Sequence, residues 1–139
     1  MYICLMQKLS RRKSLIFLFI GVLFVPFKAN AKGLATFKFS KLHIEAKSGK
    51  YEFNVEMAIT NRQLEQGLMY RRSLPSNYGM LFDYKVPRNI TMWMKNTFIP
   101  LDMIFIGANG RVVNIVERTI PRSLAVISSN GRARAVLEV

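Results

Sequence analysis

The sequence contains very little cysteine and histidine, and this narrows the chemistry open to the protein. Cys4 is the only cysteine and His43 the only histidine among 139 residues. A disulfide needs two cysteines, and zinc sites need spaced Cys and His ligands that this chain does not have. There is also no Gly-x-Ser-x-Gly, His-Glu-x-x-His or glycine-rich phosphate loop. The sequence therefore offers no motif for a resident metal or cofactor, and it assigns no reaction.

The first 31 residues have the three-part pattern of a secretory signal peptide. Basic residues lie between Lys8 and Lys13, an uncharged apolar run covers residues 15–27, and Ala29-Asn30-Ala31 matches an A-x-A cleavage site. A membrane-spanning helix needs about 20 apolar residues, which is more than this run provides. We therefore expect cleavage after Ala31 and an exported protein, periplasmic or extracellular. An uncleaved anchor and a cytoplasmic location are the alternatives.

Removal of residues 1–31 changes the chemistry of the chain. Cys4 is lost, and so are five of the 21 basic residues but none of the eight acidic ones, so the net charge falls from +13 to +8. Residues 32–139 suffice for one domain that buries roughly 60–65% of its unfolded surface. The charge predicts either a solvated basic surface or attraction to anionic envelope components. Export argues against nucleic acid as a partner, and no membrane span is expected after cleavage.

Residues 36–59 have the pattern of a β-hairpin. Apolar residues occupy every second position from Tyr51 to Ile59, and a similar alternation runs from Lys41 to Ala46. This period of two is typical of strands with one buried face. Lys47-Ser48-Gly49-Lys50 between the two segments suits a tight turn.

Residues 61–71 predict one short helix. Thr60 and Gln63 have the spacing of a capping box, and Leu64 and Leu68 fall on one helical face. Gly67 inside a helix costs about 1 kcal/mol relative to Ala. A close contact between the helix and a sheet would explain why a glycine stands there.

The rest of the chain predicts short strands separated by turns. Asn109-Gly110 and Asn130-Gly131 are typical of tight turns, because both residue types tolerate a positive φ. We expect strands at residues 80–82, 91–98, 101–106, 111–117 and 133–139, with a loop at 86–89. Together with the hairpin, this predicts a mainly β (α+β) fold. We expect a single small β-sandwich or partly open barrel of about seven strands with one short helix.

The segment from Met92 to Phe105 contains the candidate site. Trp93, the only tryptophan, stands with Lys95, Asn96 and Asp102 among apolar residues. Burying such polar groups without partners costs about 1–3 kcal/mol each, so they need partners or a ligand. The four residues form either a structural polar cluster, with an ion pair between Lys95 and Asp102, or the lining of a ligand pocket. A catalytic acid–base role for Asp102 is a third interpretation.

Methionine supports a weaker alternative. On a strand, Met92 and Met94 would share one face, and thioethers are ligands that select Cu(I). Methionine is also ordinary core filler, so a copper site and a packing role both remain open. His43 lies between Lys41 and Glu45 and is interpreted as solvated.

Five short strings give the chain a resemblance to a known family. They are Gly67-Leu68-Met69, Gly79-Met80-Leu81-Phe82, Trp93-Met94-Lys95-Asn96-Thr97, Pro100-Leu101-Asp102 and Leu137-Glu138. In this order, over about residues 42–139, they resemble DUF192, an uncharacterised conserved family of bacteria and archaea. The resemblance implies a small, mainly β domain of sandwich type, often exported, with no established activity. Similar proteins continue past the Leu-Glu string, so a C-terminal truncation at Val139 is one interpretation of this chain.

Two classes of function remain. The first is an exported, non-catalytic binding or accessory module of the cell envelope, whose unidentified ligand contacts Trp93, Lys95, Asn96 and Asp102. The second is an enzyme that acts on envelope carbohydrate or a similar polymer, with Asp102 as the essential carboxylate. Cu(I) binding through Met92 and Met94 is a further alternative.

Overall fold

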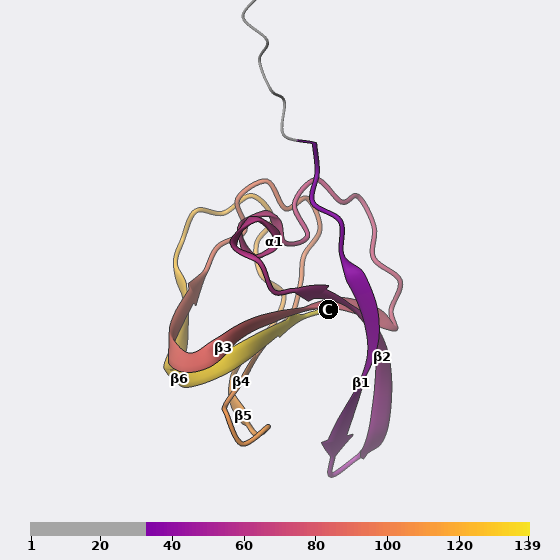
Figure 1. The fold of residues 1–139 in the computed structure, drawn as a ribbon, viewed down its shortest axis with the longest axis vertical. Coiled ribbons are helices and arrows are strands. Elements are labelled where there is room, and N and C mark those ends of the chain that lie inside the picture. The colour runs from indigo at the N-terminus through magenta and orange to yellow at the C-terminus, as the bar shows by residue number, and fades with distance from the viewer. Residues whose placement is uncertain (1–32) are drawn as a thin grey trace, which may run out of the picture. The chain divides into compact units, whose positions relative to one another are not determined.

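The computed structural model describes residues 33–139, and the predicted signal peptide at residues 1–31 lies outside the described residues. This part of the chain is mainly β, with six strands in one mixed sheet that is not closed into a barrel (Figure 1). The elements are β1 (Lys38–Ala46), β2 (Gly49–Ala58), α1 (Asn61–Gln66), β3 (Tyr78–Met92), β4 (Met103–Ile106), β5 (Val112–Val116) and β6 (Ile127–Glu138). The predicted mainly β fold class is confirmed.

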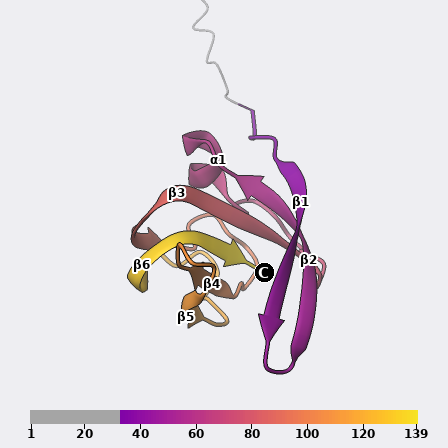
Figure 2. The ribbon, with the colours of Figure 1, turned by 60° about the horizontal axis from the view of Figure 1, so that its bottom comes forward.

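The strand order β1-β2-β3-β6-β4-β5 places the last strand of the chain in the middle of the sheet. The β1–β2 hairpin forms where the sequence predicts it, and it extends beyond the curved pair β3 and β6 (Figure 2). Only β2 and β3 are parallel among the described strands. Parallel neighbours need a crossover connection, and α1 with the loop that follows it provides one.

Helix α1 begins with the predicted capping box. The backbone N–H of Gln63 donates to Thr60 Oγ1, and the Gln63 side chain accepts from the Thr60 N–H at 3.0 Å. The helix ends at Gln66, earlier than predicted, because Gly67 has a φ of 50°. A Cβ at position 67 would lie 2.9 Å from Phe82 Cζ. The predicted close contact between helix and sheet at this glycine is therefore confirmed.

Strands β3 and β6 are longer than the sequence predicts. The expected loop at 86–89 lies within β3, and the expected turn at Asn130-Gly131 lies within β6. Both places are irregular positions in the β3–β6 ladder. At the second of these places, Ser129 Oγ accepts from the Ile90 N–H at 3.0 Å and donates to the carbonyl of Gly131. The hydroxyl thus replaces a backbone hydrogen bond that the ladder lacks between Asn89 and Thr91. Both breaks are bulges that bend a continuous strand.

The sequence predicts a strand at residues 91–98, but β3 ends at Met92 and residues 93–98 form a loop. Asn96 has a φ of 56°, which lies far from the dihedral angles of a regular strand. The Thr97 N–H donates to the Met94 carbonyl at 3.0 Å, and this closes a turn. The structure therefore has six strands where the sequence predicts about seven, since the strand expected at 91–98 contributes only the end of β3.

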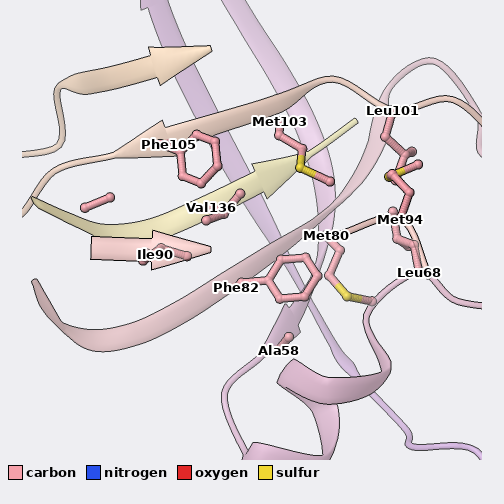
Figure 3. Packing of buried hydrophobic residues seen from close by; sticks show 11 residues of the cluster. Ala58, Leu68, Met80, Phe82, Ile90, Met94, Leu101, Met103, Phe105 and Val136 are labelled. Atoms are coloured by element: carbon pink, nitrogen blue, oxygen red, sulfur yellow. The ribbon is translucent and has the colours of Figure 1, made fainter. Parts of the chain in front are cut away.

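The core lies on the face of the sheet that α1 covers. Phe82 and Val136 are paired across β3 and β6, and Phe105 pairs with Val136 across β4 and β6. These side chains are fully buried and pack together with Met80 and Met103 (Figure 3). In residues 33–139 no helix is long and apolar enough to cross a membrane.

Candidate functional site

A cavity of about 470 Å³ opens beside the core. Its wall comes from α1 and the turn after it, from β3, from the loop that follows β3 and from the end of β6. Most of the wall is apolar or aromatic, with Leu64, Phe82, Met92 and Trp93 among its residues. Cavities of this size and character are where proteins usually hold small organic ligands.

Glu138 is the polar group that distinguishes this cavity. Its backbone pairs with Met80 on one side and Met103 on the other, so its side chain points to the core face of the sheet. Only 4% of the residue is exposed. Residues 33–139 offer its carboxyl group no hydrogen bond or ion pair, yet they contain no fully enclosed polar side-chain atom without a partner. The carboxyl group is therefore open to the cavity that it lines.

Burial raises the pKa of Glu138 from an ordinary value of 4.5 to about 8. A carboxylate in an apolar wall loses its hydration, and the uncharged acid is favoured. Tyr84 shares this environment, and burial likewise raises the pKa of its phenol, with a smaller opposing effect from Arg88 and a still smaller raising effect from Glu138. At neutral pH the cavity therefore presents a protonated carboxylic acid and a neutral phenol, whose O–H donates to Met92 Sδ at 3.3 Å.

Two aromatic side chains of the cavity wall contact basic residues. Lys95 Nζ lies 5.1 Å from the centroid of the Trp93 ring, and the Arg88 guanidinium lies 4.4 Å from that of Tyr84. These are cation–π distances. Trp93 is 49% exposed and so stands at the opening of the cavity.

The structure does not bring the four residues of the predicted polar cluster together. Trp93 lines the cavity, and Lys95 reaches it only by way of the Trp93 ring. Asn96 shapes the loop. Its side-chain amide donates to Tyr70 Oη at 3.0 Å, and its backbone carbonyl accepts from the Tyr70 N–H. No ion pair joins Lys95 and Asp102 in the described part of the chain.

Asp102 holds backbone together instead. Its Oδ1 accepts from the Arg118 N–H at 2.7 Å. Its own backbone exchanges two hydrogen bonds with Val139, at 2.9 and 3.1 Å. The two backbone bonds fasten the chain before β4 to the end of β6. The Arg118 N–H gives the carboxylate a structural partner.

The two methionines of the copper alternative do not share a strand face. Met92 ends β3, and Met94 lies in the following loop with its side chain fully buried. Met92 Sδ accepts from the Tyr84 O–H, and Met94 Sδ lies 3.2 Å from Thr119 Oγ1, whose proton goes to the Leu101 carbonyl. Within residues 33–139 no group of three or more His, Cys, Asp or Glu side chains is placed to hold a metal ion.

Sequence reasoning did not single out Glu138 as a site residue. It entered only as part of a family string at the end of the chain. The available signal was its position at the end of β6, directly after the apolar residues Val136 and Leu137. Its importance depends on β6 being a central strand, and only the topology shows this.

Comparison with known proteins places these features in a family. The DUF192 family, described as an uncharacterized ACR, matches residues 43–139. This confirms the resemblance found in the sequence strings. No curated protein matches the chain.

Two crystal structures are similar to this one. The first is of a proposed transcription regulator from Sinorhizobium meliloti 1021, 41% identical, covering 77% of this chain and 84% of that one, with a TM-score of 0.73. The second is of a protein of unknown function from Novosphingobium aromaticivorans DSM 12444, 35% identical, covering 76% of each chain, with a TM-score of 0.74.

Proposed function

We propose that this chain, which belongs to the DUF192 family, is a non-catalytic module that binds a small organic molecule in the cavity around Glu138. One observation carries the proposal. Glu138, only 4% exposed, faces an otherwise largely apolar cavity of about 470 Å³, and residues 33–139 offer its carboxyl group no hydrogen bond or ion pair. Leaving such a group unpaired is costly, and a ligand that bonds to it removes the cost.

The proposal keeps one of the residues that the sequence suggested for ligand contact and replaces the others. Trp93 supplies a large, half-exposed aromatic surface at the opening. Glu138 supplies the polar anchor at the inner wall. Asn96 and Asp102 bond to other parts of the protein, which supports a role for them in shaping the loop and not in binding.

We also propose that the module is exported to the periplasm or the extracellular space. The support is the pattern of residues 1–31 and the cleavage motif that ends at Ala31. A net charge of +8 after cleavage would favour anionic envelope components as neighbours. Fractionation of cells that express the full chain, with mass analysis of the product, tests this. We expect a product that begins at Lys32 outside the cytoplasm, and an uncleaved cytoplasmic product would contradict the proposal.

A thermal-shift screen against a small-molecule library tests the binding role. A ligand that binds only the folded state raises the midpoint of unfolding, by the equivalent of about 2.7 kcal/mol at 100 times its Kd. Val126 lines the cavity but is 72% exposed, so Val126→Trp should obstruct the opening without disturbing the core. Leu124, 66% exposed and outside the cavity wall, gives the matched control Leu124→Trp.

We expect ligands that stabilise the unsubstituted protein to lose their effect on Val126→Trp and to keep it on Leu124→Trp. Ligands that stabilise both variants equally would place binding elsewhere. A screen without any stabilising compound would contradict the proposed function.

A further inference from the structure

We propose that the cavity selects a small organic cation, an ammonium group on an apolar body, with Glu138 as its counter-charge. This inference rests on the binding role proposed above and adds the chemical class of the ligand. Three observations support it. They are the charged side chains of the cavity wall, the buried position of Glu138 in that wall, and the other partners of the basic residues nearby.

The charge of the wall is opposite to that of the protein. The chain has 21 basic and eight acidic residues. Yet Glu65 and Glu138 are the charged residues of the cavity wall, and no lysine, arginine or histidine belongs to it. An anionic ligand would find no basic side chain in this wall. A cation would find two acidic side chains in this wall, and complementary charge of this kind gives specificity.

Glu138 occupies the place that a counter-charge needs. It stands at the buried part of the wall and is paired with Met80 on the neighbouring strand. Phe82 and Met92 supply apolar surface for the body of the ligand. Glu65 is exposed and belongs to the last turn of α1. An ammonium group beside Glu138 would therefore lie in a largely apolar wall with one buried carboxylate, and an ion pair is strong in such an environment.

Three basic residues beside the cavity have partners other than Glu138. Lys95 contacts the Trp93 ring, and Arg88 contacts the Tyr84 ring. Arg71 pairs with Glu56, which lies in the same row of the sheet as Met80 and Glu138. Within residues 33–139 no basic side chain forms an ion pair with Glu138. Burial is the cause of the raised pKa of Glu138. The other charged or titratable groups at or beside the wall are Glu65 from α1, Tyr84 and Arg88 from β3, Lys95 from the loop after β3, and the Glu56–Arg71 pair.

Binding of a cation should release a proton. Burial holds the pKa of Glu138 at about 8, so the free carboxyl group is mostly protonated at pH 7. A bound ammonium group favours the carboxylate, because an opposite charge within a few ångströms lowers the pKa of an acid. The proton leaves to the buffer, and this release is a signature that neutral ligands lack.

The experiment uses three matched probes of nearly equal size and different charge. They are 2-phenylethylammonium, 2-phenylethanol and phenylacetate, each titrated calorimetrically into the protein at pH 7 in phosphate and in Tris. We expect the ammonium to bind at least about tenfold more tightly than the alcohol, with phenylacetate weakest. The ammonium enthalpies should differ between the two buffers because a proton is released, and those of the alcohol should agree.

Two variants locate the effect. Glu138→Gln removes the charge and keeps the shape, and it should weaken ammonium binding about tenfold or more while it leaves the alcohol within about threefold. Glu65→Gln removes the other carboxylate of the wall and should change ammonium binding by less than about threefold. The two-buffer comparison on the unsubstituted protein needs no variant and stands even if Glu138→Gln does not fold.

The outcomes separate this inference from the proposed function. If the alcohol binds as tightly as the ammonium, or if Glu138→Gln keeps the preference, the cation assignment is wrong while the cavity remains a binding site. If none of the three probes binds, the cation assignment is also wrong. The thermal-shift comparison of Val126→Trp with Leu124→Trp then decides separately whether the cavity binds anything.

Discussion

Two regions place polar groups among apolar ones. They are residues 93–102, here called the crossover segment, and the cavity around Glu138. The regions differ in whether the protein itself supplies partners for those polar groups. In the crossover segment the half-buried polar side chains find protein partners. Asp102 bonds to the Arg118 N–H, and Asn96 bonds to Tyr70. In the cavity, residues 33–139 offer the carboxyl group of Glu138 no such partner, and it is open to the cavity that it lines. A polar residue in an apolar stretch therefore signals a need for a partner, and only the fold shows whether the protein supplies it.

The crossover segment is fastened at both ends. The Thr119 hydroxyl donates to the Leu101 carbonyl at 2.7 Å and accepts from the Leu101 N–H at 3.2 Å. The Met94 N–H donates to the carbonyl of Ser123. These bonds fix the loop that carries Trp93, so the segment shapes the cavity opening without supplying its anchor.

The largest expected effect comes from Glu138→Gln on the pH dependence of stability. Because the pKa of Glu138 rises on folding from 4.5 to about 8, the folded protein holds more protons than the unfolded chain between these values. The free energy of unfolding should therefore fall as the pH rises through this window, by up to roughly 5 kcal/mol. Glu138→Gln should abolish this fall.

Urea unfolding at pH 5, 6.5 and 8.5 measures the effect. Glu65→Gln is the control, because it removes an exposed carboxylate of the same wall. It should retain the fall seen in the unsubstituted protein. An equal pH dependence in Glu138→Gln would show that Glu138 is not the group that titrates.

Thr119→Val should have the next largest effect, this time on the crossover segment. The substitution keeps the shape but leaves the buried Leu101 N–H without its acceptor. We expect a loss of about 1–3 kcal/mol in the free energy of unfolding. Thr119→Ser retains the hydroxyl and should lose clearly less. A Thr119→Val variant as stable as Thr119→Ser would mean that this hydrogen bond does not fasten the segment.

Asp102→Ala should cost about 1 kcal/mol, because the Arg118 N–H loses its acceptor. Asp102→Asn keeps an oxygen in that place and should be close to the unsubstituted protein. Neither variant should change ligand affinity in the cavity. This result would separate the binding role from the alternative in which Asp102 is an essential catalytic carboxylate. A loss of ligand affinity or of a measured activity in Asp102→Asn, with stability unchanged, would revive that alternative.

Lys95→Ala should have the smallest effect. The cation–π contact with Trp93 is exposed and worth about 0.5–1 kcal/mol at most. We expect a stability change in this range and a small change in Trp93 fluorescence, both reversed in Lys95→Arg. A loss of several kcal/mol would show that Lys95 has a partner that the structure does not reveal.

Local signals allowed much of the fold to be predicted. The alternation from Tyr51 to Ile59 predicted the hairpin, and the Thr60–Gln63 spacing predicted the start of α1. The two Asn-Gly pairs show where such signals fail. Gly110 has a φ of 76° in a tight turn, whereas Asn130 has a φ of 51° in a bulge of β6. The dipeptide predicts a positive φ, but pairing with a distant strand decides whether the chain reverses there.

The candidate site was less predictable for the same reason. Trp93 was recognised because a lone tryptophan beside polar residues is conspicuous in the sequence. Glu138 became a site residue only because β6 lies between β3 and β4 and turns its side chain to the core face. The alternating pattern of residues 91–98 also suits a strand, and the sequence therefore predicts one there, with a break at residues 98–100. Nothing local indicated the positive φ of Asn96 that ends the pattern.

The central claim is that Glu138 is a buried, unpaired carboxyl group that faces the cavity. A carbon-13 NMR titration of the Glu138 side-chain carboxyl, assigned by comparison with Glu138→Gln, tests it most directly. Without ligand, we expect its resonance to titrate with a pKa of about 8, and 2-phenylethylammonium should lower this pKa. A carboxyl resonance that titrates near the ordinary value of 4.5 would show that Glu138 is solvated or paired, and would contradict the account.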